Sequence, residues 1–281
     1  MKLHFTKMHG IGNDYIYFNC MEEELADPGA VSRAMAPRHF SVGGDGVVMI
    51  CRSDVADAKM RMFNLDGSEG RMCGNAIRCV GKYLYDNGIV QKTSLTVETL
   101  SGIKTLELFL KDGKVDTVSV DMGYADFSPA VIPLAASEEY IDRTVEVMGQ
   151  KWHLTALSMG NPHAVTYVAN VDALDLDKMG PHFENHPLFP ERVNTEFVEV
   201  LGRRTLKMRV YERGSGETWA CGTGACATVA ASARNGIVPF DEPITVKLVG
   251  GDLSIVCHSD YRIVMTGSAT KVYDGVYEYE D

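Results

Sequence analysis

Residues 67–79 read GSEGRMCGNAIRC, and residues 214–226 read GSGETWACGTGAC. In each stretch an acidic Gly/Ser turn precedes a cysteine, and small residues follow it. The two cysteines, Cys73 and Cys221, are 221 − 73 = 148 positions apart. The same shift relates three further pairs: Glu69 and Glu217, Gly12-Asn13 and Gly160-Asn161, and the segments NGIV at 87–90 and 235–238. Because these anchors share one shift, we infer an internal duplication.

Each half predicts an α+β fold. The helix candidates, Gly74 to Asp86 and Gly222 to Arg234, each end at Asn-Gly, a common stop signal. Each is the one strong helix candidate of its half, among short alternating runs such as AKMRMFN and LKMRVYE that predict strands. We therefore expect two pseudo-symmetric repeats, each a curled, mostly antiparallel sheet around a central helix, with the active site in the cleft between them.

The expected boundaries follow from the shift. Residues 1–122 are expected to form the N-terminal repeat, completed by a C-terminal strand at 270–281, and residues 123–269 the C-terminal repeat. The segment 124–148, with two prolines and a polar stretch, breaks the alternating pattern and predicts a linker.

Composition limits the class of protein. The 281 residues are 45% hydrophobic, as in an ordinary globular chain, and carry a net charge of −11. That charge argues against nucleic acid or an anionic membrane as partner. We find no signal peptide or 18-residue apolar run and expect a cytoplasmic protein. The seven cysteines form no C-x-x-C, so we expect reduced thiols and no metal.

A cysteine at a helix N-terminus faces unpaired N–H groups, which lower the thiol pKa and favour thiolate. The following glycines let an anion approach the backbone. Either cysteine alone is equally well read as a small buried hydrophobic residue. As a pair on opposite faces of one carbon, they are the minimal machinery for inverting a stereocentre: one thiolate removes a proton and the other thiol supplies one. Two helix dipoles aimed at the α-carboxylate would stabilise the carbanion, so no cofactor is required.

Five segments carry a family resemblance: HGIGNDY, FNLDGSEGRMCGNAIRC, GNPHAV, RVNTEFV and YERGSGETWACGTGACA. Together they resemble, in the same order, the signature segments of the diaminopimelate epimerase family. The resemblance implies a homodimer that needs no pyridoxal phosphate (PLP) and interconverts LL- and meso-diaminopimelate, a small diamino diacid, for lysine and peptidoglycan synthesis.

The resemblance also implies the site residues. Cys73 and Cys221 would be the base and acid pair, and His163 and Glu212 catalytic auxiliaries. The substrate would be bound by Asn13, Asn64, Gly74, Asn75, Asn161, Asn194, Glu212, Arg213, Gly222 and Thr223. Several of these residues also have a structural alternative. The asparagines could only form hydrogen bonds with the backbone of their own loops. Glu212 and Arg213 could form a surface ion pair, and His163 could be an ordinary strand residue.

Two positions depart from the family pattern. Ala76 stands where many members have Gly, so a positive φ there would be strained. Gly46 stands where some members have Gln, which removes one possible contact to substrate. The shift places Asn194 opposite Gly46 (194 − 46 = 148), so the second half still supplies an amide.

Other function classes fit less well. The glycine-rich segment at 214–226 resembles a phosphate cradle, but the chain has no G-x-x-x-x-G-K-[ST]. In an amino-acid-binding protein two reactive thiols would be an oxidation liability, and a cysteine hydrolase needs one nucleophile oriented by His. The nearest rival is a cofactor-independent racemase of another amino acid, such as histidine or proline. The distal polar set Asn64, Asn194 and Arg213 favours diaminopimelate.

Overall fold

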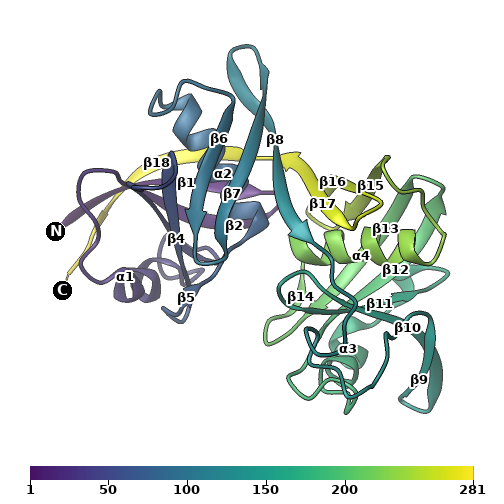
Figure 1. Cartoon of the computed structure of the whole chain (residues 1–281). Coiled ribbons are helices and arrows are strands. Elements are labelled where there is room, and N and C mark those ends of the chain that lie inside the picture. Colours follow the sequence, from purple (N-terminus) through teal and green to yellow (C-terminus); the bar gives the residue numbers. More distant parts are fainter. Residues whose placement is uncertain (281) are drawn as a thin grey trace. The chain divides into compact units, whose positions relative to one another are not determined.

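The computed structural model describes residues 1–280 (Figure 1). The chain divides into two compact units. Unit 1 comprises Met1–Val120 and the segment from Thr266 onward, and unit 2 comprises Asp121–Met265. The strand expected at 270–281 is present as β18 (Thr270–Glu278), and residue 281 lies outside the described residues.

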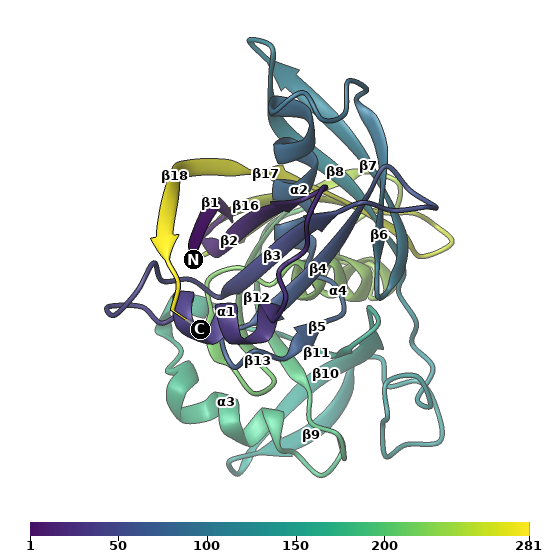
Figure 2. The same ribbon diagram turned by 90° about the vertical axis from the view of Figure 1, so that its left-hand side faces the viewer.

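Unit 1 is an α+β unit whose strands surround one long helix. Its strand β1 pairs antiparallel with both β18 and β2, β2 pairs parallel with β3, and β3 pairs antiparallel with β4. The helix α2 contacts β1, β2 and β7 (Figure 2), and most of its residues are buried. The elements are β1 (Lys2–Gly10), β2 (Asn13–Cys20), α1 (Pro28–Met35), β3 (Gly46–Cys51), β4 (Ala58–Asn64), β5 (Glu69–Gly70), α2 (Gly74–Asp86), β6 (Ser94–Thr99), β7 (Gly102–Lys111) and β8 (Lys114–Tyr124).

Unit 2 repeats this arrangement. Its helix α4 contacts β10, β11, β12 and β16, and its small residues are almost all buried. The strand β9 pairs with β10 as β18 pairs with β1 in unit 1. The elements are β9 (Arg143–Val147), β10 (Gln150–Ser158), β11 (Pro162–Tyr167), η1 (Val171–Ala173), α3 (Leu176–Glu184), β12 (Asn194–Gly202), β13 (Thr205–Glu212), β14 (Gly216–Thr218), α4 (Gly222–Arg234), β15 (Pro243–Leu248), β16 (Gly251–Cys257) and β17 (Arg262–Ser268).

The two units share one strand register. Tyr15 on β2 lies opposite Gly46 on β3, and His163 on β11 lies opposite Asn194 on β12. Both pairs are related by the 148-residue shift, and so are the first and last residues of α2 and α4. The predicted α+β fold of two repeats is therefore confirmed.

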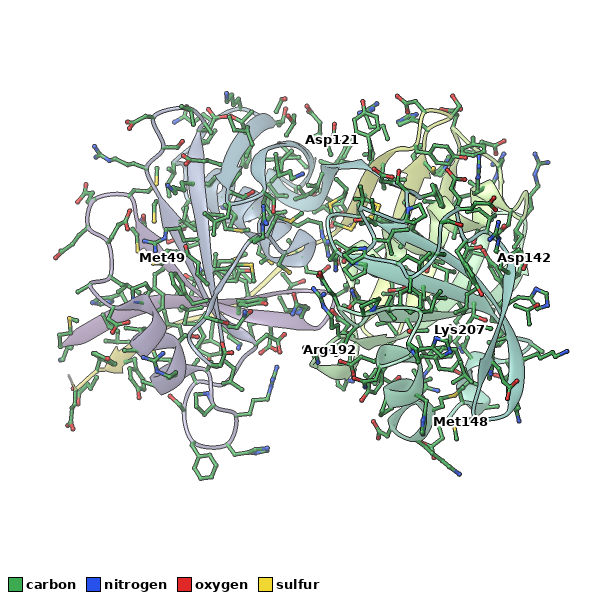
Figure 3. The ribbon with its side chains drawn as sticks, turned by 60° about the horizontal axis from the view of Figure 1, so that its bottom comes forward. Met49, Asp121, Asp142, Met148, Arg192 and Lys207 are labelled. Atoms are coloured by element: carbon green, nitrogen blue, oxygen red, sulfur yellow. The ribbon has the colours of Figure 1, made fainter. Side chains whose placement is uncertain are left out.

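The linker prediction for 124–148 is wrong. This segment contains β9, and its residues Phe127, Ile132 and Leu134 are buried. The hairpin from β9 to β10 turns at Met148-Gly149, where both residues have positive φ (53° and 73°), and Met148 stands at its tip in Figure 3. The prolines interrupt the alternation without removing the segment from the core, because its apolar side chains still pack into unit 2.

The sequence also predicted only one helix in each half, and this was wrong. The helices α1 and α3 are short, with 8 and 9 residues, and α3 contains Pro181. Short amphipathic stretches with Gly and Pro give a weak periodic signal. Within residues 1–280, no helix is long and apolar enough to cross a membrane.

Candidate active site

Each motif cysteine is the N-cap of the central helix of its unit. The backbone N–H of Ala76 donates to Sγ of Cys73 at 3.5 Å, and that of Gly224 donates to Sγ of Cys221 at 3.3 Å. Sulfur thus occupies the place that a hydroxyl or carboxylate oxygen takes at most helix starts. The first-turn N–H groups and the positive end of the helix dipole make each place suited to an anion.

In unit 1, Cys73 contacts Asn13. The Sγ of Cys73 donates to Oδ1 of Asn13 at 3.2 Å, and Nδ2 of Asn13 donates to the Asp45 carboxylate at 2.6 Å. Asp45 in turn pairs with Arg38 at 3.0 Å. Because a carboxylate accepts only, Asp45 fixes the Asn13 amide with its oxygen toward the sulfur. Sequence reasoning missed Asp45, although it directly precedes Gly46, a position that the comparison with the family pattern singled out.

The other site residues predicted in unit 1 lie nearby in the fold with different partners. Asn64, the last residue of β4, lies opposite Gly46 and donates to the Ser68 hydroxyl at 3.0 Å. Gly74 and Asn75 form the first turn of α2 and are buried. Their predicted contribution, backbone N–H groups at the helix start, agrees with that place in the helix.

In unit 2, a chain of polar contacts leads to Cys221. The ring of His163 lies between Glu196 Oε1, 2.7 Å from Nδ1, and Asn161 Oδ1, 3.0 Å from Nε2. Nδ2 of Asn161 lies 3.5 Å from the Thr223 hydroxyl, which lies 3.6 Å from Sγ of Cys221. The structure thus brings together three of the predicted site residues, His163, Asn161 and Thr223. It adds Glu196, which sequence reasoning missed.

The surroundings of Cys221 correct one expectation. Burial raises the pKa of the Cys221 thiol well above its ordinary value, and the carboxylates of Glu212 and Glu196 raise it further. These effects outweigh the helix N-terminus, so Cys221 rests as a thiol at neutral pH rather than as the thiolate favoured by its position alone. Glu212 is held by the Thr218 hydroxyl, which donates to its Oε1.

Asn194 and Arg213 are joined through the backbone. The N–H of Arg213 donates to Oδ1 of Asn194 at 2.9 Å, and Nδ2 of Asn194 donates to the Pro162 carbonyl at 2.8 Å. The Arg213 guanidinium donates to the Glu191 carbonyl at 3.1 Å, beside Arg192, which is labelled in Figure 3. Among the ion pairs of residues 1–280, none joins Arg213 to Glu212, so the surface-pair reading does not describe this structure.

The structure resolves both departures from the family pattern. Ala76 lies in the first turn of α2 and is not among the described residues with positive φ, so it carries no strain. Gly46 has φ +155°, and a Cβ there would lie 1.9 Å from the Phe63 carbonyl oxygen. No side chain fits at this position, and the backbone of Phe63 occupies the space.

Solved structures with similar folds include enzymes of several kinds. A Bacillus anthracis phenazine biosynthesis protein of the PhzF family aligns with a TM-score of 0.73 at 17% identity, over 99% of this chain and 100% of that one. A hydroxyproline epimerase from Agrobacterium vitis, solved with bound trans-4-hydroxy-L-proline, aligns with a TM-score of 0.73 at 14% identity, over 98% and 92%. At these identities the likeness concerns the fold alone.

Sequence relatives are much closer. The family model of diaminopimelate epimerase matches residues 5–128 and 155–272. The diaminopimelate epimerase of Acetivibrio thermocellus is 56% identical over 97% of this chain and 98% of its own length. That of Methanococcus maripaludis is 52% identical over 96% and 98%. The chain therefore belongs to the diaminopimelate epimerase family.

Proposed function

We propose that this chain interconverts LL- and meso-diaminopimelate by a two-thiol mechanism that needs no PLP. One observation carries the proposal: Cys73 and Cys221 cap the two helices that the duplication makes equivalent. In epimerisation, the forward and reverse reactions remove the α-proton from opposite faces of the same carbon. Two equivalent thiols, one for each face, suit such a reaction. Family membership makes the chain an epimerase, which is an isomerase.

The proposed reaction moves one proton off the α-carbon and another onto it. In one direction the thiolate of Cys73 takes the α-proton, and the electron pair remains on the α-carbon, conjugated with the carboxylate. The thiol of Cys221 then delivers its proton to the opposite face, leaving Cys221 as thiolate and Cys73 as thiol. The raised pKa of Cys221 supports its role as the acid in this direction. Cys73 must first give up the hydrogen that it donates to Asn13 Oδ1 before it acts as the base. In the reverse direction the two roles exchange.

The α-carboxylate must be stabilised as negative charge grows on it. The N–H groups at the starts of α2 and α4 suit this task, since each helix contributes about half a positive charge at its N-terminus. We assign the backbones of Gly74, Asn75, Gly222 and Thr223 to this carboxylate. Donors fixed before the reaction cost no reorganisation during it, which is how the chain replaces the electron sink of a cofactor.

The distal end of the substrate carries a second ammonium and carboxylate. We assign the distal carboxylate to Arg213, whose planar fork donates two parallel N–H bonds. The amides of Asn64 and Asn194 complete that end, and Asn194 also holds the backbone of Arg213. A racemase of a simple amino acid has no use for these groups. The resemblance further implies a homodimer, and we expect a cytoplasmic enzyme.

A substrate panel tests the proposal. Purified enzyme is incubated separately with LL-diaminopimelate, L-histidine, L-proline and L-lysine, and the stereoisomers are separated by chiral chromatography. We expect meso-diaminopimelate to appear without added PLP, and no inversion of the other three. Inversion of histidine or proline with none of diaminopimelate would replace the proposed substrate.

A further inference from the structure

A carboxylate with no assigned role lies in the interior of unit 2. Glu196 is the third residue of β12, and its side chain is fully buried, with 0% exposed. Its Oε1 lies 2.7 Å from Nδ1 of His163, which is also 0% exposed. Its Oε2 has no hydrogen-bond partner among the described residues. A buried carboxylate is strongly disfavoured unless it is paired or protonated, so the contact with His163 determines its state.

The geometry allows the protons to be counted. Nε2 of His163 faces Oδ1 of Asn161 at 3.0 Å, and an amide oxygen only accepts, so Nε2 carries a hydrogen. Nδ2 of the same amide lies 3.5 Å from the Thr223 hydroxyl, which can accept its hydrogen. One further proton lies between Nδ1 and Glu196, on either atom. In both arrangements the buried pair has no net charge.

We infer that Glu196 is a positioning residue for the epimerisation: by binding Nδ1 it holds His163 as the Nε2–H donor and thereby fixes Asn161. This inference rests on the proposed function, because it concerns the site around Cys221. The hydrogen bond made by one ring nitrogen determines whether the other nitrogen carries a hydrogen. Without Glu196, His163 is free to place its hydrogen on Nδ1, and an unprotonated Nε2 would then oppose Oδ1 of Asn161.

The start of α4 packs against the same carboxylate. A Cβ on Gly224 would lie 2.7 Å from Glu196 Oε1, so a larger residue there would displace the carboxylate. Two other titratable groups act on this pair and its surroundings: Glu212, whose charge raises the pKa of Glu196, and Cys221. The proton shared with His163 offsets part of the negative charge that Glu196 presents to Cys221, which must become a thiolate in each reaction cycle.

Two substitutions separate positioning from a structural role. Glu196→Gln keeps the size and a hydrogen bond to Nδ1, whereas Glu196→Leu keeps the size alone. Glu199→Gln is the matched control, since Glu199 lies on the same strand and accepts from the Val171 N–H, away from the cysteine. The measurements are kcat and KM for diaminopimelate, thermal melting, and the ¹⁵N signals of the His163 ring, identified by their loss in His163→Gln.

We expect Glu196→Leu to lower kcat roughly 10- to 100-fold, by analogy with the loss of groups that orient metal-binding histidines. Its melting temperature should fall, because the buried Nδ1 of His163 loses its partner, whereas Glu196→Gln should melt near the native protein. Glu196→Gln should recover most of the lost kcat, and its spectra should show Nε2 protonated as in the native protein. In Glu196→Leu a mixture of ring tautomers should appear.

Three outcomes would overturn the inference: full activity in Glu196→Leu, Glu196→Gln as inactive as Glu196→Leu, or an unchanged ring tautomer in Glu196→Leu. The spectroscopic measurement needs no substrate. If the native enzyme does not act on diaminopimelate, the proposed function fails, while the state of the His163 ring still decides whether Glu196 positions it.

Discussion

The N–H of Gly224 donates to Sγ of Cys221 across 3.3 Å at the start of α4, yet Cys221 is buried, with 5% of the residue exposed, and the charges of two carboxylates act on its thiol. The hydrogen bond favours thiolate, whereas burial and the charges of Glu212 and Glu196 favour thiol. Together these effects raise the pKa of Cys221, so at neutral pH its sulfur carries a proton that it can donate.

The raised pKa predicts slow alkylation of Cys221. Only thiolate reacts with iodoacetamide, so the rate at Cys221 should still be rising above about pH 8.5, where an ordinary cysteine is half ionised. Glu212→Gln removes one of the opposing charges, so it should shift the rate profile to lower pH. Glu146→Gln, at an exposed position of β9, should not. Mass spectrometry of the Cys221 peptide over a pH series measures the rate. A midpoint below that of an ordinary cysteine would contradict this electrostatic account.

Removal of either sulfur is expected to stop epimerisation. Cys73→Ala and Cys221→Ala each leave one face of the carbanion without a proton carrier, and a general acid or base typically contributes 10²- to 10⁴-fold. Cys226→Ala is the matched control, because Cys226 is buried in the same helix as Cys221 and carries no proposed role. Chiral chromatography gives the turnover, and thermal melts check the fold. Near-normal turnover in either motif variant would exclude the two-thiol mechanism.

Gly46 is predicted to be indispensable to the fold of unit 1. Gly46→Ala forces a Cβ against the Phe63 carbonyl in a strained conformation, so it should lower the free energy of unfolding by about 3 kcal/mol or more. Gly88→Ala also imposes a positive φ, at 71°, but meets nothing within 4 Å, and it should cost only about 1 kcal/mol. Urea denaturation of both variants measures the difference. If both variants lose the same free energy of unfolding, the backbone at Phe63 must move away from the added Cβ at little cost, which would contradict this prediction.

Arg213 is predicted to act on binding and catalysis rather than on stability. Arg213→Lys and Arg213→Ala should both lower kcat/KM for diaminopimelate, since an unpaired buried carboxylate costs about 3 to 5 kcal/mol, or roughly two to four decades. Arg203→Lys, whose side chain is 76% exposed, is the control and should change nothing. Lower melting temperatures with unchanged kcat/KM would remove Arg213 from the site.

The duplication and the central helices were predictable because they rest on local signals. The Asn-Gly stops and the cysteines repeat at one shift, and both predicted helices have the bounds that the structure shows. The short helices and the buried segment at 124–148 were not predictable, because their order comes from tertiary packing rather than from periodicity. Local propensity is a weak guide where packing decides.

The sequence predicted a site residue only where the residue type is unusual for its local sequence. A cysteine followed by glycine is conspicuous in a sequence, and so is an asparagine at the end of a strand. Asp45 and Glu196, which contact such residues in the fold, have no comparable signal. The partner of Asn13 is 32 positions away, and that of His163 is 33 positions away. The one available signal for Glu196 was a glutamate beside the apolar Phe197 and Val198 in β12. Charged residues are rarely buried without a partner.

The most direct test of the two-thiol account is a single-isomer reaction in D₂O. LL-diaminopimelate is incubated with the enzyme, and early in the reaction the α-deuterium content of product and of remaining substrate is measured by NMR and mass spectrometry. With two separate thiols, the meso product should carry deuterium at the inverted carbon from the first turnovers, while the remaining LL substrate stays protiated. Early product that retains the original proton would show that one group removes and returns it, and would contradict the account.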